Sequence, residues 1–248
     1  MLTHIEQDSK LLELVKGKSI SLVAPAPYLI GKGRGKEFDN YDLIVRPNEI
    51  IPLPNLRKDY GHRTDILFCN FGTPWMPGIK RKIQLNDNVD HFKKMKMVIG
   101  SAIKADHSEV NYLQWPDNHI SNVPKNFESI NDFNLPFYWI GVKDYKKLYN
   151  IIGVEFNTGI AAIAMLLHYP IERLNLAGFT FYHGGNSYKE LYCEGHMDSQ
   201  DTNGRSFGIS AGHGRFAHMK QLAFFKDLYH NHRDIITIDD EMRRILSL

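Results

Sequence analysis

The sequence lacks several features that mark whole classes of protein. It contains two cysteines, Cys69 and Cys193, so it can form at most one disulfide bond, which excludes a disulfide-stapled secreted scaffold. No apolar run approaches the length of a signal peptide or membrane-spanning segment, and residues 1–15 are polar and amphipathic. Because sparse cysteine fits a reducing compartment, we expect a cytoplasmic protein, from a bacterium or from a cell infected by a virus or phage.

Strong charge and metal-ligand patterns are also missing. A formal net charge of +2 is too small to require a nucleic acid or an anionic membrane as partner. The twelve histidines form no H-E-x-x-H pattern and no Cys/His ligand spacing. We therefore predict no metal site and no bound cofactor.

What the sequence does contain is an alternation of short β-prone runs with helical patterns. With 248 residues, of which 43% are apolar, the chain can bury one sizeable core, and we expect a single domain over residues 1–248. Apolar runs typical of strands lie at residues 19–24, 43–45, 65–69, 95–99, 137–142, 174–177 and 235–238. Helical patterns cover residues 3–16, 158–169, 215–230 and 239–248. This alternation predicts a three-layer α/β/α, Rossmann-like domain with a mostly parallel sheet.

Polar side chains follow two of the expected strands, and a glycine-rich loop follows the first. Gly31, Gly33 and Gly35 would let the backbone approach a ligand closely. Asn48 and Asn70 stand at the ends of two predicted strands, and in open α/β sheets ligands bind outside the carboxyl ends of the strands. An amide side chain both donates and accepts hydrogen bonds, so we expect Asn48 and Asn70 in a nucleotide crevice.

Residues 158–169 are apolar nearly all round, which is typical of a buried helix, and Asn157 is in position to cap it. With Thr158 and Gly159 in its first turn, the helix start would offer free N–H groups and the positive end of its dipole to a phosphate. On the residues alone, a capped helix that binds no ligand is the alternative.

Two blocks of sequence resemble motifs of the animal-type sialyltransferases. The long sialyl motif is a glycine-lysine-glutamate-isoleucine-aspartate run followed by an aspartate, an arginine and an asparagine. This chain has a similar run, Gly35-Lys36-Glu37-Phe38-Asp39, followed by Asp42, Arg46 and Asn48. A further aspartate-x-glycine-x-x-threonine turn of that family is matched by Asp59, Gly61 and Thr64. The short motif, a serine-threonine-glycine turn, a helix and a strand ending in glycine-phenylalanine, is resembled by Asn157-Thr158-Gly159 and residues 174–179.

The resemblance implies a GT-A-like variant of the fold and an inverting glycosyltransferase that takes its sugar from a CMP-activated donor. The absence of a D-x-D triplet, which in many other glycosyltransferases holds a divalent cation against a diphosphate, suits a metal-independent departure of CMP. Animal members are membrane-anchored and disulfide-bonded, and this chain departs from them in both respects. The resemblance adds to the nucleotide set the strand-end positions Ala24, Pro25 and Gly178.

The resemblance also implies the catalytic residues, which fall in or beside a long segment, 178–212, that is rich in Gly, His, Tyr and Asn. The family places a histidine-tyrosine pair there that donates to the leaving phosphate, and the nearest such pair here is Tyr182-His183. We expect His183 to contact the phosphate, with Tyr188 as the second candidate. His196 is the candidate if His183 is not at the phosphate. We predict His213 as general base, because it stands before a helix where the family has a histidine. An imidazole with an ordinary pKa of about 6.5 is mostly neutral at pH 7, as a base must be.

Departures from the family leave the substrates open. Ala24-Pro25-Ala26 stands where the family has a glycine-asparagine-serine turn, so the sugar is sialic acid, another ulosonic acid such as Kdo, or a pentose on another nucleotide. The acceptor is a glycan, a lipid-linked molecule or a nucleic acid. One alternative is a phage glycosyltransferase that uses another nucleotide-sugar and modifies DNA. The acceptor groove would then be lined by Lys80-Arg81-Lys82 and Lys93-Lys94. A non-catalytic nucleotide- or carbohydrate-binding module is the other alternative; a Rossmann oxidoreductase is disfavoured because the G-x-G-x-x-G spacing is absent.

Overall fold

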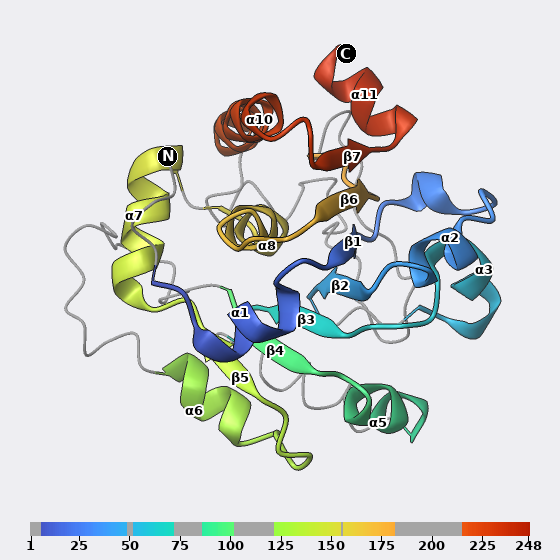
Figure 1. Ribbon diagram of the computed structural model, residues 1–248, viewed down its shortest axis with the longest axis vertical. Helices are drawn as coiled ribbons and strands as arrows, with labels where there is room; N and C mark the ends of the chain where they lie inside the picture. Colours follow the sequence, from blue (N-terminus) through green and yellow to red (C-terminus); the bar gives the residue numbers. More distant parts are fainter. Residues whose placement is uncertain (1–5, 49–51, 72–85, 102–121, 155, 182–214) are drawn as a thin grey trace, which may run out of the picture.

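The computed structural model describes residues 6–48, 52–71, 86–101, 122–154, 156–181 and 215–248. Within them one seven-stranded sheet runs in the order β5-β4-β3-β2-β1-β6-β7 (Figure 1), and every neighbouring pair is parallel. The strands are β1 Ser19–Val23, β2 Leu43–Pro47, β3 Ile66–Cys69, β4 Met97–Gly100, β5 Phe137–Trp139, β6 Arg173–Ala177 and β7 Ile236–Ile238. The predicted parallel α/β sheet is confirmed, with each strand close to its predicted run.

The strand order reverses once. The chain lays down β1 to β5 in succession toward one edge, and β6 then returns to pair with β1 on its other side. The switch point therefore lies between β1 and β6, where open α/β sheets form a ligand crevice at the carboxyl ends of the strands.

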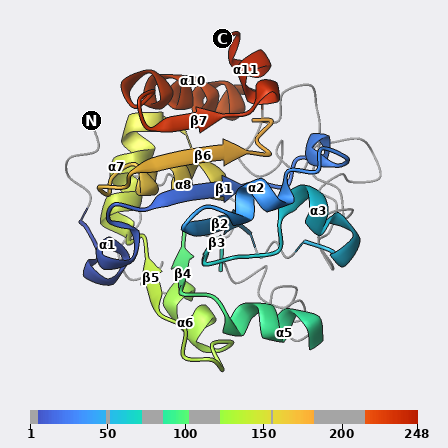
Figure 2. The ribbon, with the colours of Figure 1, turned by 45° about the vertical axis from the view of Figure 1, so that its right-hand side comes forward.

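Helices cover both faces of the sheet and make the predicted three layers. In Figures 1 and 2, α7, α8 and α10 lie on one side of the sheet, and α2, α3 and α5 on the other. The helices are α1 Ser9–Val15, α2 Gly35–Asp39, α3 Arg57–Tyr60, α5 Asn86–Lys93, α6 Asn122–Glu128, α7 Val142–Ile152, α8 Thr158–Leu166, α10 Arg215–Asn231 and α11 Asp240–Leu246; short 3₁₀ turns span Pro27–Leu29 and Pro54–Leu56. None of the helices in the described ranges is long and apolar enough to span a membrane.

The apolar core differs between the two faces. Under α8 the core is continuous, because side chains such as Leu22, Val45 and Phe68 meet a helix whose nine residues are all buried. On the opposite face the core is split: one cluster lies over β1 and β6, around Val23 and Ala177, and another lies over β3 and β4. Between these strands β2 presents Arg46, which is fully buried.

The N-terminal helix begins later than the sequence pattern predicts. Residues 6–8 are not helical, and α1 starts at Ser9 because the Asp8 carboxylate accepts a hydrogen bond from the Leu11 N–H (2.8 Å) and caps the first turn. The helix predicted from residue 3 therefore starts too early. The helix packs on the core, since Leu11 and Val15 are buried in the same apolar cluster as α8.

Candidate functional site

The two predicted strand-end amides lie at the ends of neighbouring strands. Asn48 follows β2 and Asn70 follows β3, and both are half-buried at the carboxyl edge of the sheet. The Asn48 N–H donates to the Phe68 carbonyl (2.6 Å), so the end of β2 is held against β3. Asn48 has a φ of 58°, a left-handed conformation that asparagine adopts more readily than most residues. This edge therefore carries an amide side chain at the end of each of two neighbouring strands.

The N-terminus of α8 comes to the same edge. The helix packs on β2 and β3 and is followed directly by the parallel strand β6, so its first turn lies at the carboxyl ends of the strands. The Asn157 side chain accepts from the Ile160 N–H (2.9 Å), which confirms the predicted cap. The Asn157 N–H in turn donates to Gln221 Oε1 (3.0 Å) on α10. The positive end of the α8 dipole is thus fixed at the edge that carries Asn48 and Asn70.

Thr158 and Gly159, also predicted for the nucleotide site, are both buried. A Cβ on Gly159 would lie 2.8 Å from Cε1 of Phe179, the second residue after the end of β6. The glycine of the Asn-Thr-Gly turn therefore makes room for the phenylalanine of the Gly-Phe strand end. The two halves of the short-motif resemblance are packed against each other in space, and Phe179 covers the first turn of α8.

Ala24, Pro25 and Gly178 lie at the switch point and are buried. Gly178 has a φ of 80°, and a Cβ there would overlap the Ala24 carbonyl oxygen. Its N–H donates to the Tyr28 hydroxyl (2.8 Å) and to Asp239 Oδ2 (3.2 Å), while Tyr28 donates to the same carboxylate (2.6 Å). Burial and the negative charge of Asp239 raise the pKa of Tyr28, which therefore stays neutral. Backbone, the half-buried Tyr28 and the buried Asp239 thus fill the switch point and make a rigid floor, and the half-buried amides Asn48, Asn70 and Asn157 lie at the same edge of the sheet.

The glycine-rich loop differs from the sequence prediction, in which its backbone approaches a ligand. The Gly33 N–H donates to Asp59 Oδ1 (2.7 Å), and although burial works against ionisation of Asp59, the N–H groups of Gly31 and Gly33 hold the pKa of its carboxyl below the usual range. Gly35 begins α2, and a Cβ there would overlap the Arg57 carbonyl oxygen of α3. The loop thus turns its N–H groups toward the protein's own Asp59, and the close approach at Gly35 is between two helices.

The other residues of the long-motif resemblance make contacts of the same kind, and we call this set, with Gly35 and Asp59, the α2–α3 network. Asp42 Oδ2 accepts from both the N–H (2.8 Å) and the hydroxyl (2.6 Å) of Ser19, which ties β2 to β1. Asp39 accepts from the backbone N–H groups of His62 (3.0 Å) and Arg63 (3.1 Å). The Arg46 guanidinium donates to the carbonyls of Tyr60 (2.7 Å) and Arg63 (3.0 Å) and to the Thr64 hydroxyl (3.1 Å). These residues join β1, α2, β2, α3 and β3.

The structure adds one strand-end residue that the sequence reasoning missed. Ser101 follows β4, is 1% exposed, and its hydroxyl has no hydrogen-bond partner in the part of the chain that the structure describes. It stands just beyond a β-prone run, and a polar residue in that position is the signal that identified Asn48 and Asn70.

The predicted catalytic residues His213 and His183, and the predicted phosphate contact Tyr188, lie outside the described residues, so their roles stay predictions. Across the described ranges, no three His, Cys, Asp or Glu side chains are grouped closely enough to hold a metal ion.

A scan of protein families found no match to this sequence, and neither did a search of curated proteins. Among solved structures, the chain is similar to a mammalian sialyltransferase in complex with Gal-beta-1-3GalNAc-ortho-nitrophenol, with a TM-score of 0.52 and 13% identity over 96% of this chain and 76% of that chain. A second structure of a mammalian sialyltransferase gives 0.51 with the same identity and coverage. The sialyltransferase CstII from Campylobacter jejuni, in complex with CMP-3FNeuAc, gives 0.46 and 19% identity over 89% of this chain and 80% of that chain. At 13% identity the likeness to the mammalian structures concerns the fold, and the chain has the α/β fold of a sialyltransferase.

Proposed function

We propose that this protein is an inverting, metal-independent glycosyltransferase that moves sialic acid, or a related sugar, from a CMP-activated donor to an acceptor hydroxyl. The observation that supports this function best is the sialyltransferase fold, which extends over 96% of the chain. The site geometry agrees with it, because Asn48, Asn70 and the capped start of α8 meet at the carboxyl edge, where a nucleotide binds in sheets of this kind.

The chemistry requires two kinds of group. As the bond to the donor sugar breaks, negative charge develops on the leaving phosphate, and fixed hydrogen-bond donors and a helix N-terminus stabilise it. The start of α8, fixed by Asn157 and Gln221, supports the proposal, because a helix N-terminus is a group of this kind. The acceptor hydroxyl is a poor nucleophile until a general base takes its proton, and we assign that role to His213, with His183 as donor to the phosphate.

Isothermal titration of the protein with CMP and with UDP tests the donor. We expect CMP to bind and UDP to bind more weakly, because the leaving group in this proposal carries one phosphate. If UDP binds and CMP does not, the donor assignment is wrong.

His213→Ala tests the base. We expect transfer from CMP-sialic acid, measured as release of CMP in the presence of a glycan acceptor, to fall by about 10²- to 10⁴-fold while CMP affinity stays close to wild type. The comparison variants are His218→Ala, which changes the next histidine along the chain after His213, and His183→Ala. Wild-type turnover in His213→Ala together with loss in His218→Ala would show that the base is His218.

A further inference from the structure

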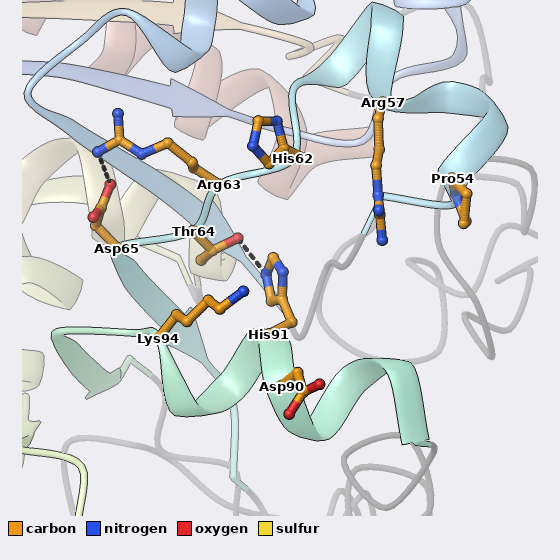
Figure 3. Close-up of a pocket in the computed structure, with 9 residues that line it drawn as sticks. All are labelled: Pro54, Arg57, His62, Arg63, Thr64, Asp65, Asp90, His91 and Lys94. Carbon is orange, nitrogen blue, oxygen red and sulfur yellow. Dashed lines mark hydrogen bonds and ion pairs between the residues drawn. The ribbon is translucent and has the colours of Figure 1, made fainter.

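A second polar site lies away from the carboxyl edge, in the gap between the two apolar clusters on the α2/α3/α5 face. It is a pocket of about 550 Å³ between α3 with its following segment and α5. Figure 3 shows side chains from both sides facing the same space. His62 to Asp65 lead into β3 and Lys94 precedes β4, so the pocket opens beside the amino ends of these strands, whereas Asn48 and Asn70 follow the carboxyl ends.

The gap is polar because the side chains at its base are polar. Arg46 on β2 lies between the strands that carry the two clusters, and its Nε donates to the Thr64 hydroxyl. The same hydroxyl lies 2.8 Å from His91 Nε2. The guanidinium can only donate, so the Thr64 oxygen accepts from Arg46, and the Thr64 hydroxyl pairs with Nε2 in either tautomer of His91. Thr64 and His91 both line the pocket, so its wall carries a hydroxyl and an imidazole.

Positive charge exceeds negative charge around the pocket. Asp65 is already compensated, because its carboxylate contacts both Arg63 (2.8 Å) and Lys96 (3.0 Å) and accepts from the Ile44 N–H (2.9 Å). Arg57 and Lys94 are exposed at the pocket, and neither forms an ion pair with any described residue. Among the lining residues that the structure describes, only Asp90 opposes these two cations.

The pKa of His91 is lowered by burial and by this excess of positive charge. Burial lowers the pKa of its imidazole, and the nearby charges of Arg46 and Arg57 lower it further, to about 3. The ring is therefore neutral at neutral pH, and it neither adds to nor cancels the charge of Arg57 and Lys94. A guanidinium and an ammonium group at one small cavity, with a hydroxyl and a neutral imidazole behind them, are the groups that bind phosphate in proteins.

We propose that this pocket binds a small phosphate monoester, of the size of a sugar phosphate, through Arg57 and Lys94 with His91 at its wall. The volume falls within the range of about 300–1,000 Å³ that is common for small-molecule sites. The site is separate from the donor-nucleotide site, and it does not depend on the transferase activity being correct.

Binding of ribose 5-phosphate, followed by ³¹P NMR titration, tests the proposal, with inorganic phosphate as the minimal probe. We expect Lys94→Gln and Arg57→Gln each to weaken binding at least about tenfold, because each removes a charge-assisted hydrogen bond. Lys93→Gln is the matched control: it removes the same charge from the same helix end, but the Lys93 ammonium lies 5.6 Å from the centre of the Phe133 ring and does not line the pocket. All three side chains are exposed, so the variants should fold, and circular dichroism checks this.

The result that supports the proposal is a loss of affinity in Lys94→Gln and Arg57→Gln but not in Lys93→Gln or in Asn48→Ala at the carboxyl edge. The proposal is overturned if the wild-type protein does not bind ribose 5-phosphate or if Lys93→Gln weakens binding equally. It is overturned also if a single-stranded DNA oligonucleotide binds through Lys94 and ribose 5-phosphate does not, since the ligand is then a nucleic acid backbone. None of these results bears on CMP binding at Asn48, so the phosphate-site proposal and the proposed function are tested independently.

Discussion

The α2–α3 network and the carboxyl edge of the sheet both contain residues that resemble sialyltransferase motifs, but they use those residues differently. In the network, Asp39, Asp42 and Asp59 accept hydrogen bonds from backbone N–H groups, and Gly35 lets two helices touch. At the carboxyl edge, Asn48 and Asn70 are half-buried at the ends of neighbouring strands. Most residues that resemble the motifs therefore hold the fold together, and under the proposed function the strand-end amides are the ones that contact the nucleotide.

The largest effect should come from adding one methyl group at the switch point. In Gly178→Ala the new Cβ overlaps the Ala24 carbonyl oxygen at a φ of 80°, so both the contact and the backbone are strained. We expect a loss of more than about 3 kcal/mol in the free energy of unfolding, measured by urea denaturation.

Gly31→Ala is the control, because Gly31 has the same φ of 80° but no described atom within 4 Å of the position that the new methyl group would take. It should cost only the backbone strain, about 1–2 kcal/mol. Equal losses in the two variants would mean that the contact with Ala24 is not close, and the rigid floor of the site would lose its support.

The next effect is a dependence of stability on pH that arises at His91, beside Thr64 of the network. Its pKa is about 3 in the folded protein and about 6.5 in an unfolded chain, so between these values the unfolded state binds a proton that the folded state does not. Stability should therefore fall as the pH is lowered from 6.5 toward 3. From pH 7 to pH 5 we expect a loss of about 1–2 kcal/mol from this group.

His91→Gln keeps an acceptor for the Thr64 hydroxyl and should flatten that pH dependence, measured by urea denaturation at pH 7 and pH 5. His230→Gln, on the exposed side of α10, should leave it as in the wild type. If both variants behave alike, His91 is not the source of the pH dependence.

A smaller effect is expected at Asn157, where two substitutions separate the capping of α8 from the binding of the phosphate. Asn157→Ala removes the cap that accepts from Ile160 and should cost about 1 kcal/mol of stability. Asn157→Asp keeps the cap but places a negative charge at the start of α8, so it should retain stability and bind CMP more weakly. Wild-type CMP affinity in Asn157→Asp, measured by titration calorimetry, would mean that the start of α8 does not face the phosphate.

Local patterns in the sequence were enough to predict the sheet. Most of its strands are apolar β-prone runs closely followed by proline, glycine or asparagine, and the alternation with helices predicted that they would be parallel. The same logic placed Asn48 and Asn70 at one edge, because a residue that follows a parallel strand must lie there. The Asn157 cap could be predicted for a similar reason, since it depends on the four consecutive positions 157–160.

Contacts between distant segments could not be predicted in this way. The closure of the glycine loop on Asp59 depends on how α3 packs against α2, and no local pattern in either segment records it. The pocket between Arg57 and His91 arises because two apolar clusters on one face leave β2 between them. His183, Tyr188 and His213 rest on the resemblance alone.

The central claim is that the donor nucleotide binds at the carboxyl edge, and titration of CMP into Asn48→Gly and Lys94→Gln tests it most directly. Glycine at position 48 removes the amide but keeps the left-handed backbone at φ 58°, so stability should hold, whereas Lys94→Gln removes a charge from the other polar site. We predict that Asn48→Gly weakens CMP binding about tenfold and that Lys94→Gln leaves it unchanged. Unchanged CMP affinity in a folded Asn48→Gly, with loss in Lys94→Gln, would contradict the account and place the nucleotide between α3 and α5.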